Sequence, residues 1–143
     1  MTTIRQILAR KPEIYSIDPD ATVFDALRQL EERNVGALLV MKGELLVGIF
    51  SERDYARRMI LQGRTSRETP VRDVMTTKVF VITPDTTSGE CMMHMTDRHV
   101  RHLPVVEGGR VVGVISIGDV VRSVIHDLRF TVRQLESYIK SGG

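Results

Sequence analysis

The sequence repeats itself at a spacing of 65 residues. Residues 16–60 align with residues 81–125 without a gap, and 15 of the 45 paired positions are identical. The identical pairs include Pro19/Pro84, Asp20/Asp85, Thr22/Thr87, Gly48/Gly113, Ser51/Ser116 and Asp54/Asp119. An internal duplication of this length restricts the fold to two copies of one small unit, each of about 60 residues.

Each copy contains the same order of predicted elements. A short extended entry and a Pro-Asp-x-Thr turn lead into a helix, two apolar strands and a second helix. Thr22 and Thr87 are predicted to cap the first helix of each copy. The apolar face of that helix is predicted from Val23, Ala26, Leu27 and Leu30 in the first copy and from Cys91, Met92 and Met95 in the second. Short glycine-containing links predict that the two strands form antiparallel hairpins, so the predicted fold class is α/β with two tandem β-α-β-β-α repeats.

A unit of this size is marginally stable alone, so we expect the repeats to pack sheet against sheet as a pseudo-twofold pair with one shared core. The predicted divisions are repeat 1 with its lead-in "IRQIL" (1–62), a polar linker (63–70), repeat 2 with its lead-in "VRDVM" (71–127) and a C-terminal helical extension (128–143). An apolar stripe in the extension is predicted from Leu128, Val132, Leu135 and Ile139. We expect the paired apolar helices and this stripe to produce a homodimer.

Composition narrows the classes of partner and compartment. Lys and Arg number 20 against 18 Asp and Glu, and aromatic residues make up 5%, which does not favour a nucleic-acid partner. No apolar run approaches the roughly 20 residues that cross a membrane, and the N-terminus "MTTIRQILARKPE" has no apolar signal core. The single Cys91 excludes an internal disulfide and fits a reducing compartment. We therefore expect a cytoplasmic protein without a membrane partner.

The junctions "GIFSERD" and "GVISIGD" allow two interpretations. In the first, Ser51 and Ser116 cap a helix and the carboxylate three residues later returns to the cap amide. In the second, the helix N-terminus attracts phosphate, while Asp54 and Asp119 accept hydrogen bonds from ribose hydroxyls. The glycine before each junction would then let a ligand approach the backbone closely. Sugar and phosphate together indicate a nucleotide.

These two junctions, the order of elements, "RHLPVV" and the duplication resemble a tandem pair of cystathionine-β-synthase-type (CBS) domains, of the small stand-alone bacterial type. The resemblance extends from about residue 4 to residue 127. It implies that an adenosine-containing ligand, namely AMP, ATP, NAD(H) or S-adenosylmethionine, binds in clefts between the repeats.

The resemblance also implies roles for particular residues. Asp54 and Asp119 would bind ribose, with Ser51 and Ser116 beside them. The other implied ligand-binding residues are Arg53, Arg101, His102 and Pro104, and the positions that match Arg101 and His102 in the first copy are Gly36 and Ala37. Because Gly36 and Ala37 carry no charge and Gly118 replaces Arg53 in the second copy, we expect the two clefts to differ. Sequence alone leaves open which aspartate shares a cleft with Arg101.

Catalysis and metal binding are not expected. The spacing of His94, His99, His102 and Cys91 crosses a predicted helix-to-strand boundary, and no second cysteine supports a metal site. No nucleophile with a neighbouring base indicates an enzyme. The predicted function is a regulatory module that binds an adenine nucleotide and acts on an unidentified effector protein in trans. The alternative is a ligand-independent assembly scaffold in which the Ser-x-x-Asp motifs are only helix caps.

Overall fold

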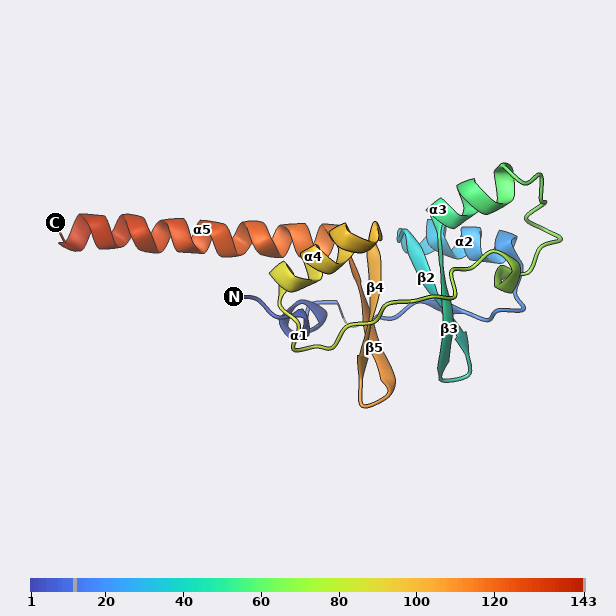
Figure 1. Cartoon of the computed structure of the whole chain (residues 1–143), viewed down its shortest axis with the longest axis horizontal. Helices are drawn as coiled ribbons and strands as arrows, with labels where there is room; N and C mark the ends of the chain where they lie inside the picture. Colours follow the sequence, from blue (N-terminus) through green and yellow to red (C-terminus); the bar gives the residue numbers. More distant parts are fainter. Residues whose placement is uncertain (12, 143) are drawn as a thin grey trace.

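A computed structural model describes residues 1–11 and 13–142 (Figure 1). The first repeat comprises β1 (Ser16–Ile17), α2 (Val23–Arg33), β2 (Ala37–Lys42), β3 (Leu45–Ser51), α3 (Glu52–Tyr55) and the π-helix η1 (Ala56–Ile60). The second comprises α4 (Ser88–Arg98), β4 (His102–Glu107), β5 (Arg110–Ser116) and α5 (Ile117–Gly142). The lead-ins form α1 (Ile4–Leu8) and a 3-10 turn, η2 (Val71–Asp73). The predicted α/β class with two tandem repeats is confirmed.

The sheets follow the predicted pattern of hairpins. Strands β2 and β3 are antiparallel, as are β4 and β5, and β1 pairs with β2 in parallel. In the second repeat Ile82 makes a single parallel bridge to Val105, in the place that β1 occupies in the first. Helices α2, α3, α4 and the start of α5 lie at one end of the hairpins, opposite their turns (Figure 1). This arrangement brings the beginnings of α3 and α5 to the same end of the molecule.

Both predicted N-caps are confirmed. The Thr22 hydroxyl accepts a hydrogen bond from the Asp25 amide at 3.2 Å, and the Thr87 hydroxyl accepts one from the Glu90 amide at 3.2 Å. The predicted apolar faces are buried at Val23, Ala26 and Leu30 in α2 and at Cys91 and Met95 in α4, while Leu27 and Met92 are partly buried. Capping and periodicity thus determine these helices locally.

The prediction of one shared core is wrong, because the described residues form two separate hydrophobic clusters. The first cluster contains Val71 and Val74 from the second lead-in, and the second contains Ile4 from the first lead-in. Each lead-in therefore packs on the repeat that it does not precede in sequence. Each repeat buries its apolar faces against a segment borrowed from the other half of the chain, which removes the need for a common core.

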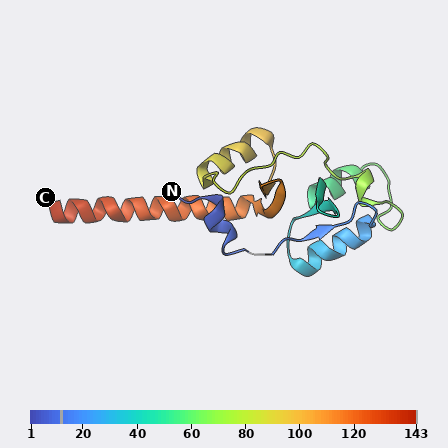
Figure 2. The same ribbon diagram turned by 90° about the horizontal axis from the view of Figure 1, so that it is seen from below.

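The C-terminal extension is not a separate element. Helix α5 runs without interruption from Ile117 to Gly142, a length of 26 residues, so the last helix of the second repeat and the predicted extension are one helix. Figures 1 and 2 show its C-terminal part extending away from the sheets. Among the helices of residues 1–11 and 13–142, none is long and apolar enough to cross a membrane.

Candidate functional site

The first cleft lies where β3 ends and α3 begins, facing the start of β4. It has a volume of about 290 Å³. Its lining includes Ser51, Arg53 and Asp54 from the first repeat and Arg101 and His102 from the second. The structure therefore places Arg101 in the cleft of Asp54, which answers the question that the sequence left open. The cleft combines residues from both repeats, and its volume is close to the lower end of the range for small-molecule pockets, about 300 Å³.

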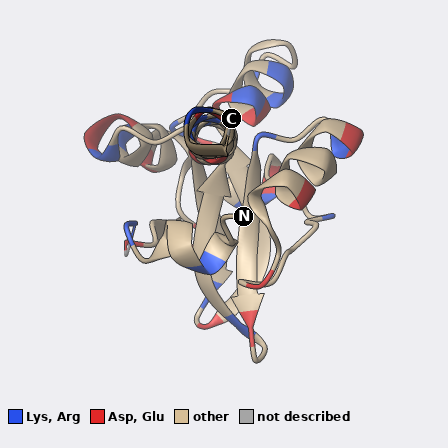
Figure 3. Cartoon of the chain, turned by 90° about the vertical axis from the view of Figure 1, so that its left-hand side faces the viewer, with Lys and Arg blue, Asp and Glu red and all other residues tan. Residues whose placement is uncertain are grey.

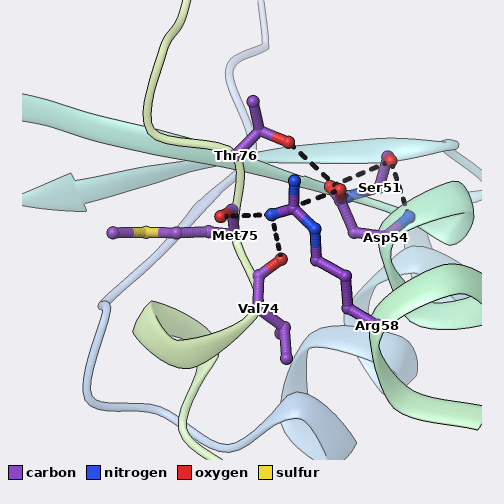
Figure 4. A network of polar contacts seen from close by, with 6 residues as sticks. All are labelled: Ser51, Asp54, Arg58, Val74, Met75 and Thr76. Carbon is purple, nitrogen blue, oxygen red and sulfur yellow. Dashed lines mark hydrogen bonds and ion pairs between the residues drawn. The ribbon is translucent and has the colours of Figure 1, made fainter. Parts of the chain in front are cut away.

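Asp54 is at the centre of a polar network in this cleft (Figure 4). One carboxylate oxygen, Oδ2, accepts hydrogen bonds from the Ser51 amide at 3.0 Å and the Ser51 hydroxyl at 3.1 Å. The other, Oδ1, accepts one from the Thr76 hydroxyl at 3.1 Å and lies 3.9 Å from Arg58 Nη1. Asp54 thus completes a capping box, and its Oδ1 contacts Thr76, which directly follows the second lead-in, and Arg58 of η1.

Arginine side chains give the first cleft a positive lining. Four arginines line it, Arg53, Arg57, Arg58 and Arg101, against the two carboxylates of Glu52 and Asp54. Arg53 donates a hydrogen bond to the His99 carbonyl at 2.7 Å, and Arg58 donates to the Met75 carbonyl at 2.7 Å and the Val74 carbonyl at 3.0 Å. These bonds hold two of the guanidinium groups in place, and guanidinium groups in fixed positions are well suited to bind phosphate.

The lead-ins explain why both copies have glycine three residues before the cap. A Cβ on Gly48 would lie 2.8 Å from the Thr76 carbonyl oxygen, and a Cβ on Gly113 would lie 2.5 Å from a methyl group of Leu8. The prediction that these glycines leave room for a ligand is therefore wrong. The chain's own lead-ins fill that space.

The second cleft surrounds Asp119 and has a volume of about 300 Å³. Its lining includes Lys11, Ser116, Arg122 and the two positions that match Arg101 and His102, Gly36 and Ala37. Asp119 Oδ2 accepts hydrogen bonds from Lys11 Nζ at 2.7 Å and the Ser116 amide at 3.0 Å, and Oδ1 accepts one from Arg122 at 2.9 Å. Burial alone would raise the pKa of Asp119, but the hydrogen bonds from Lys11 and Ser116 hold it below its ordinary value.

His102 lines both clefts. Its imidazole lies against Gly36, where an added Cβ would be 3.2 Å from Cε1. Burial, followed by the charge of Lys11, lowers the pKa of His102 from 6.5 to about 4, and Arg101 lowers it further while Asp119 opposes the shift. The side chain is therefore neutral at pH 7, so it could contact a phosphate only as a hydrogen-bond donor.

We expect the low pKa of His102 to make the folded state sensitive to acid. The unfolded chain binds this proton near pH 6.5 and the folded chain only near pH 4, so the unfolded state binds more protons in between and stability falls as pH falls. From pH 7 to pH 4.5 the wild type should lose about 2 kcal/mol more unfolding free energy than His102→Gln, measured by urea denaturation. Equal losses in the two proteins would show that His102 does not cause the pH dependence.

Five further positions remain: one predicted residue that lies outside the clefts and four residues at the clefts that were not predicted. Pro104 is buried in β4 opposite Val114 and does not line either cleft among the described residues. Thr76 and Lys11 contact the two aspartates but were not predicted, because they follow the two lead-ins and reach the clefts only where the lead-ins cross. Arg57 and Arg122, which also line the clefts, could have been found, since they form an identical pair one helical turn after each aspartate.

Comparison with known proteins agrees with this geometry. The chain matches the CBS domain twice, over residues 4–61 and 71–126. It is 46% identical to the mitochondrial CBS domain-containing protein CBSX3 of Arabidopsis thaliana over 128 residues, which are 86% of this chain and 62% of that protein. This chain thus spans less than two thirds of CBSX3. It is 31% identical to the CBS domain-containing protein YhcV of Bacillus subtilis, covering 75% of this chain and 76% of YhcV.

A solved structure shows the same fold. A putative signal-transduction protein with CBS domains from Burkholderia ambifaria superposes with a TM-score of 0.85 and 45% sequence identity, covering 88% of this chain and 96% of that one. The double match, the duplicated sequence and the shared fold lead to one conclusion. The chain belongs to the CBS-domain family, as a tandem pair of CBS domains.

Proposed function

We propose that the chain is a regulatory module that binds one adenosine-containing ligand in the first cleft and acts on a partner protein in trans. One observation carries the proposal: the carboxylate of Asp54 stands at a helix N-terminus inside a cleft lined by four arginines. A carboxylate accepts ribose hydroxyls, while the helix end and the arginines favour phosphate. A phosphorylated ribose presents both complementary groups close together.

The proposed pose follows the chemistry of the lining. The ribose hydroxyls donate to Asp54, next to the Thr76 hydroxyl. The phosphate lies toward Arg53, Arg101 and the start of α3. The apolar side chains of Ile49 and Val100, which line the same cleft, offer a surface for adenine. AMP, ATP, NAD(H) and S-adenosylmethionine share the adenosine part of this pose, and the arginines favour the phosphorylated members.

We propose that the second cleft binds such a ligand more weakly. Asp119 is already ion-paired with Lys11 at 2.7 Å and Arg122 at 2.9 Å, whereas the cation nearest to Asp54 lies at 3.9 Å. Ribose would have to replace two charge-assisted bonds at Asp119, which are the stronger class of hydrogen bond. The difference between the clefts thus favours one ligand per chain.

The family model that matches this chain is the CBS domain in both copies, and it is not a catalytic domain. We therefore propose regulation rather than catalysis. A bound ligand shifts such a module toward the state that it binds better, and a partner protein detects the shift. We propose no resident metal, since the described residues contain no group of three or more His, Cys, Asp or Glu side chains that could hold one. We also propose no nucleic-acid partner, since basic and acidic residues are interspersed over the helices and turns in Figure 3. A cytoplasmic location fits the lone, buried Cys91, although the relative CBSX3 is described as mitochondrial.

A ligand-independent assembly scaffold is the second candidate. The observation that favours it is that Ser51 with Asp54, and Ser116 with Asp119, each form reciprocal cap bonds without any ligand. A helix cap alone explains why Ser and Asp occur in both copies. The two candidates differ in what an adenosine compound does to stability.

Thermal denaturation with AMP, ATP, NAD, NADH and S-adenosylmethionine tests the proposal. A ligand at about 100 times its Kd stabilises the folded state by about 2.7 kcal/mol, which should raise the melting temperature by roughly 5–10 °C. GMP is the matched control, because it presents the same ribose and phosphate with another base. An unchanged melting temperature with all five adenosine compounds would contradict ligand binding and favour the scaffold.

A further inference from the structure

Within residues 1–11 and 13–142, no part of the chain covers the C-terminal half of α5. Every residue from 128 to 142 is exposed. The last anchoring contact is at Asp127, whose carboxylate accepts hydrogen bonds from the Thr2 amide at 3.0 Å and the Thr2 hydroxyl at 2.7 Å. Beyond it the helix extends away from the sheets in both views (Figures 1 and 2). A helical segment of this length is marginally stable in water by itself, so a second surface is needed to stabilise it.

Six of the exposed apolar residues of α5 follow a heptad repeat, while exposed Phe130 and Tyr138 lie outside that series. The six are separated alternately by four and three residues: Val121, Ile125, Leu128, Val132, Leu135 and Ile139. Their exposed fractions run from 38% for Val121 to 69% for Ile139. A spacing that averages 3.5 residues keeps all six on one seam of the helix, which is the pattern of a coiled coil.

The residue types on the seam indicate the partner. Assigning the first position of the heptad to Ile125 places β-branched residues at every such position, Ile125, Val132 and Ile139. The fourth position then holds Val121, Leu128 and Leu135. β-Branched residues at the first position with leucine at the fourth favour two parallel strands. A seam with this pattern is complementary to a second copy of itself.

The residues beside the seam are compatible with a parallel pair. In such a pair Thr131 would face Glu136 of the second copy, and Val124 would face Arg129, so no like charges meet across the seam. We propose that residues 121–139 of α5 pair in parallel with the same residues of a second copy to form a two-stranded coiled coil. None of the six seam residues lines either cleft, so the pairing does not depend on the proposed ligand.

Disulfide cross-linking tests the pairing and its direction. Leu128→Cys and Leu135→Cys, made separately, should each give mostly covalent dimer on mild oxidation, because identical seam positions face each other in a parallel pair. Native Cys91 is buried and its pKa is raised to about 11, so it stays unreactive. Ser137→Cys, on the outer face of the same helix, is the control and should give little dimer.

Two results would overturn this proposal. Cross-linking at neither position above the Ser137→Cys level would show that the seam does not pair. In an antiparallel pair, identical positions face each other only at the centre of the seam, and two positions seven residues apart cannot both lie there. Cross-linking at only one of the two positions would therefore indicate an antiparallel pair and contradict a parallel one.

Sedimentation provides a second, independent test. Leu135→Asp should weaken dimerisation at least about a hundredfold, since each dimer loses two leucines from the seam. Ser137→Asp adds the same charge outside the seam and should change the dissociation constant less than about threefold. Both residues are exposed in the chain, so neither variant disturbs the repeats. An unchanged dimer in Leu135→Asp would contradict the proposal.

Discussion

Asp54→Asn is expected to weaken AMP binding by about ten- to a hundredfold, or roughly 1.5–3 kcal/mol, because ribose loses a charge-assisted hydrogen bond. Asp119→Asn should change the affinity by less than about threefold. The reason is that the proposed ligand lies against Asp54, whereas Asp119 is ion-paired with Lys11 and Arg122. Calorimetric titration of the two variants with AMP measures the difference.

The two substitutions are matched, because asparagine keeps a carbonyl oxygen that can accept the cap amide in either copy. Each should therefore cost about 1 kcal/mol or less in unfolding free energy of the ligand-free chain. If AMP bound both variants as tightly as it binds the wild type, Asp54 and Asp119 would be helix caps only. The scaffold would then be the better account.

Gly48→Ala is expected to cost about 3 kcal/mol of unfolding free energy, and Gly113→Ala only about 1 kcal/mol. The added Cβ at Gly48 would meet the Thr76 carbonyl oxygen at 2.8 Å, and Thr76 is fixed by backbone hydrogen bonds to Ile49 at 2.9 and 3.0 Å. The Cβ at Gly113 would meet only the side chain of Leu8, whose tip can rotate. A fixed backbone cannot move away as a side chain does.

Chemical denaturation of both glycine variants measures this difference. The comparison is internal, because the two glycines occupy matching positions of the duplication and neither has a positive φ. Equal losses of stability would show that Thr76 is not held against β3 as firmly as its hydrogen bonds indicate.

Local sequence signals were sufficient to predict the first helix and the hairpin of each repeat. The Thr22 and Thr87 caps, the apolar periodicity of α2 and α4 and the glycine turns of the hairpins act within a few residues, so they can be identified in the sequence. Because the sequence is duplicated, each of these patterns occurs once in each repeat. The two repeats do support each other, but through exchanged lead-ins and not through the shared core that was predicted.

The crossing of the lead-ins could not be predicted in this way. Ile4 and Val71 are apolar at matching positions of "IRQIL" and "VRDVM", but their spacing is the same whether each packs on its own repeat or on the other. The choice depends on contacts between residues far apart in sequence. The same limit applies to Thr76 and Lys11, which reach the two aspartates only because the lead-ins cross.

The candidate site was predicted only in part, because some of its contacts are local in sequence and others join residues far apart in sequence. Ser51 and Asp54 are neighbours in sequence, and their reciprocal bonds follow from helix capping. Arg101 reaches the cleft of Asp54 through the packing of one repeat on the other, which no local pattern determines. The neutral state of His102 likewise depends on burial between the clefts.

A crystal structure of the chain with AMP tests the central claim most directly. The account predicts one nucleotide per chain in the first cleft, with its ribose against Asp54 and its phosphate toward Arg53 and Arg101. The second cleft should remain without nucleotide while Lys11 stays paired with Asp119. A nucleotide bound only at Asp119, or equally in both clefts, would contradict the account.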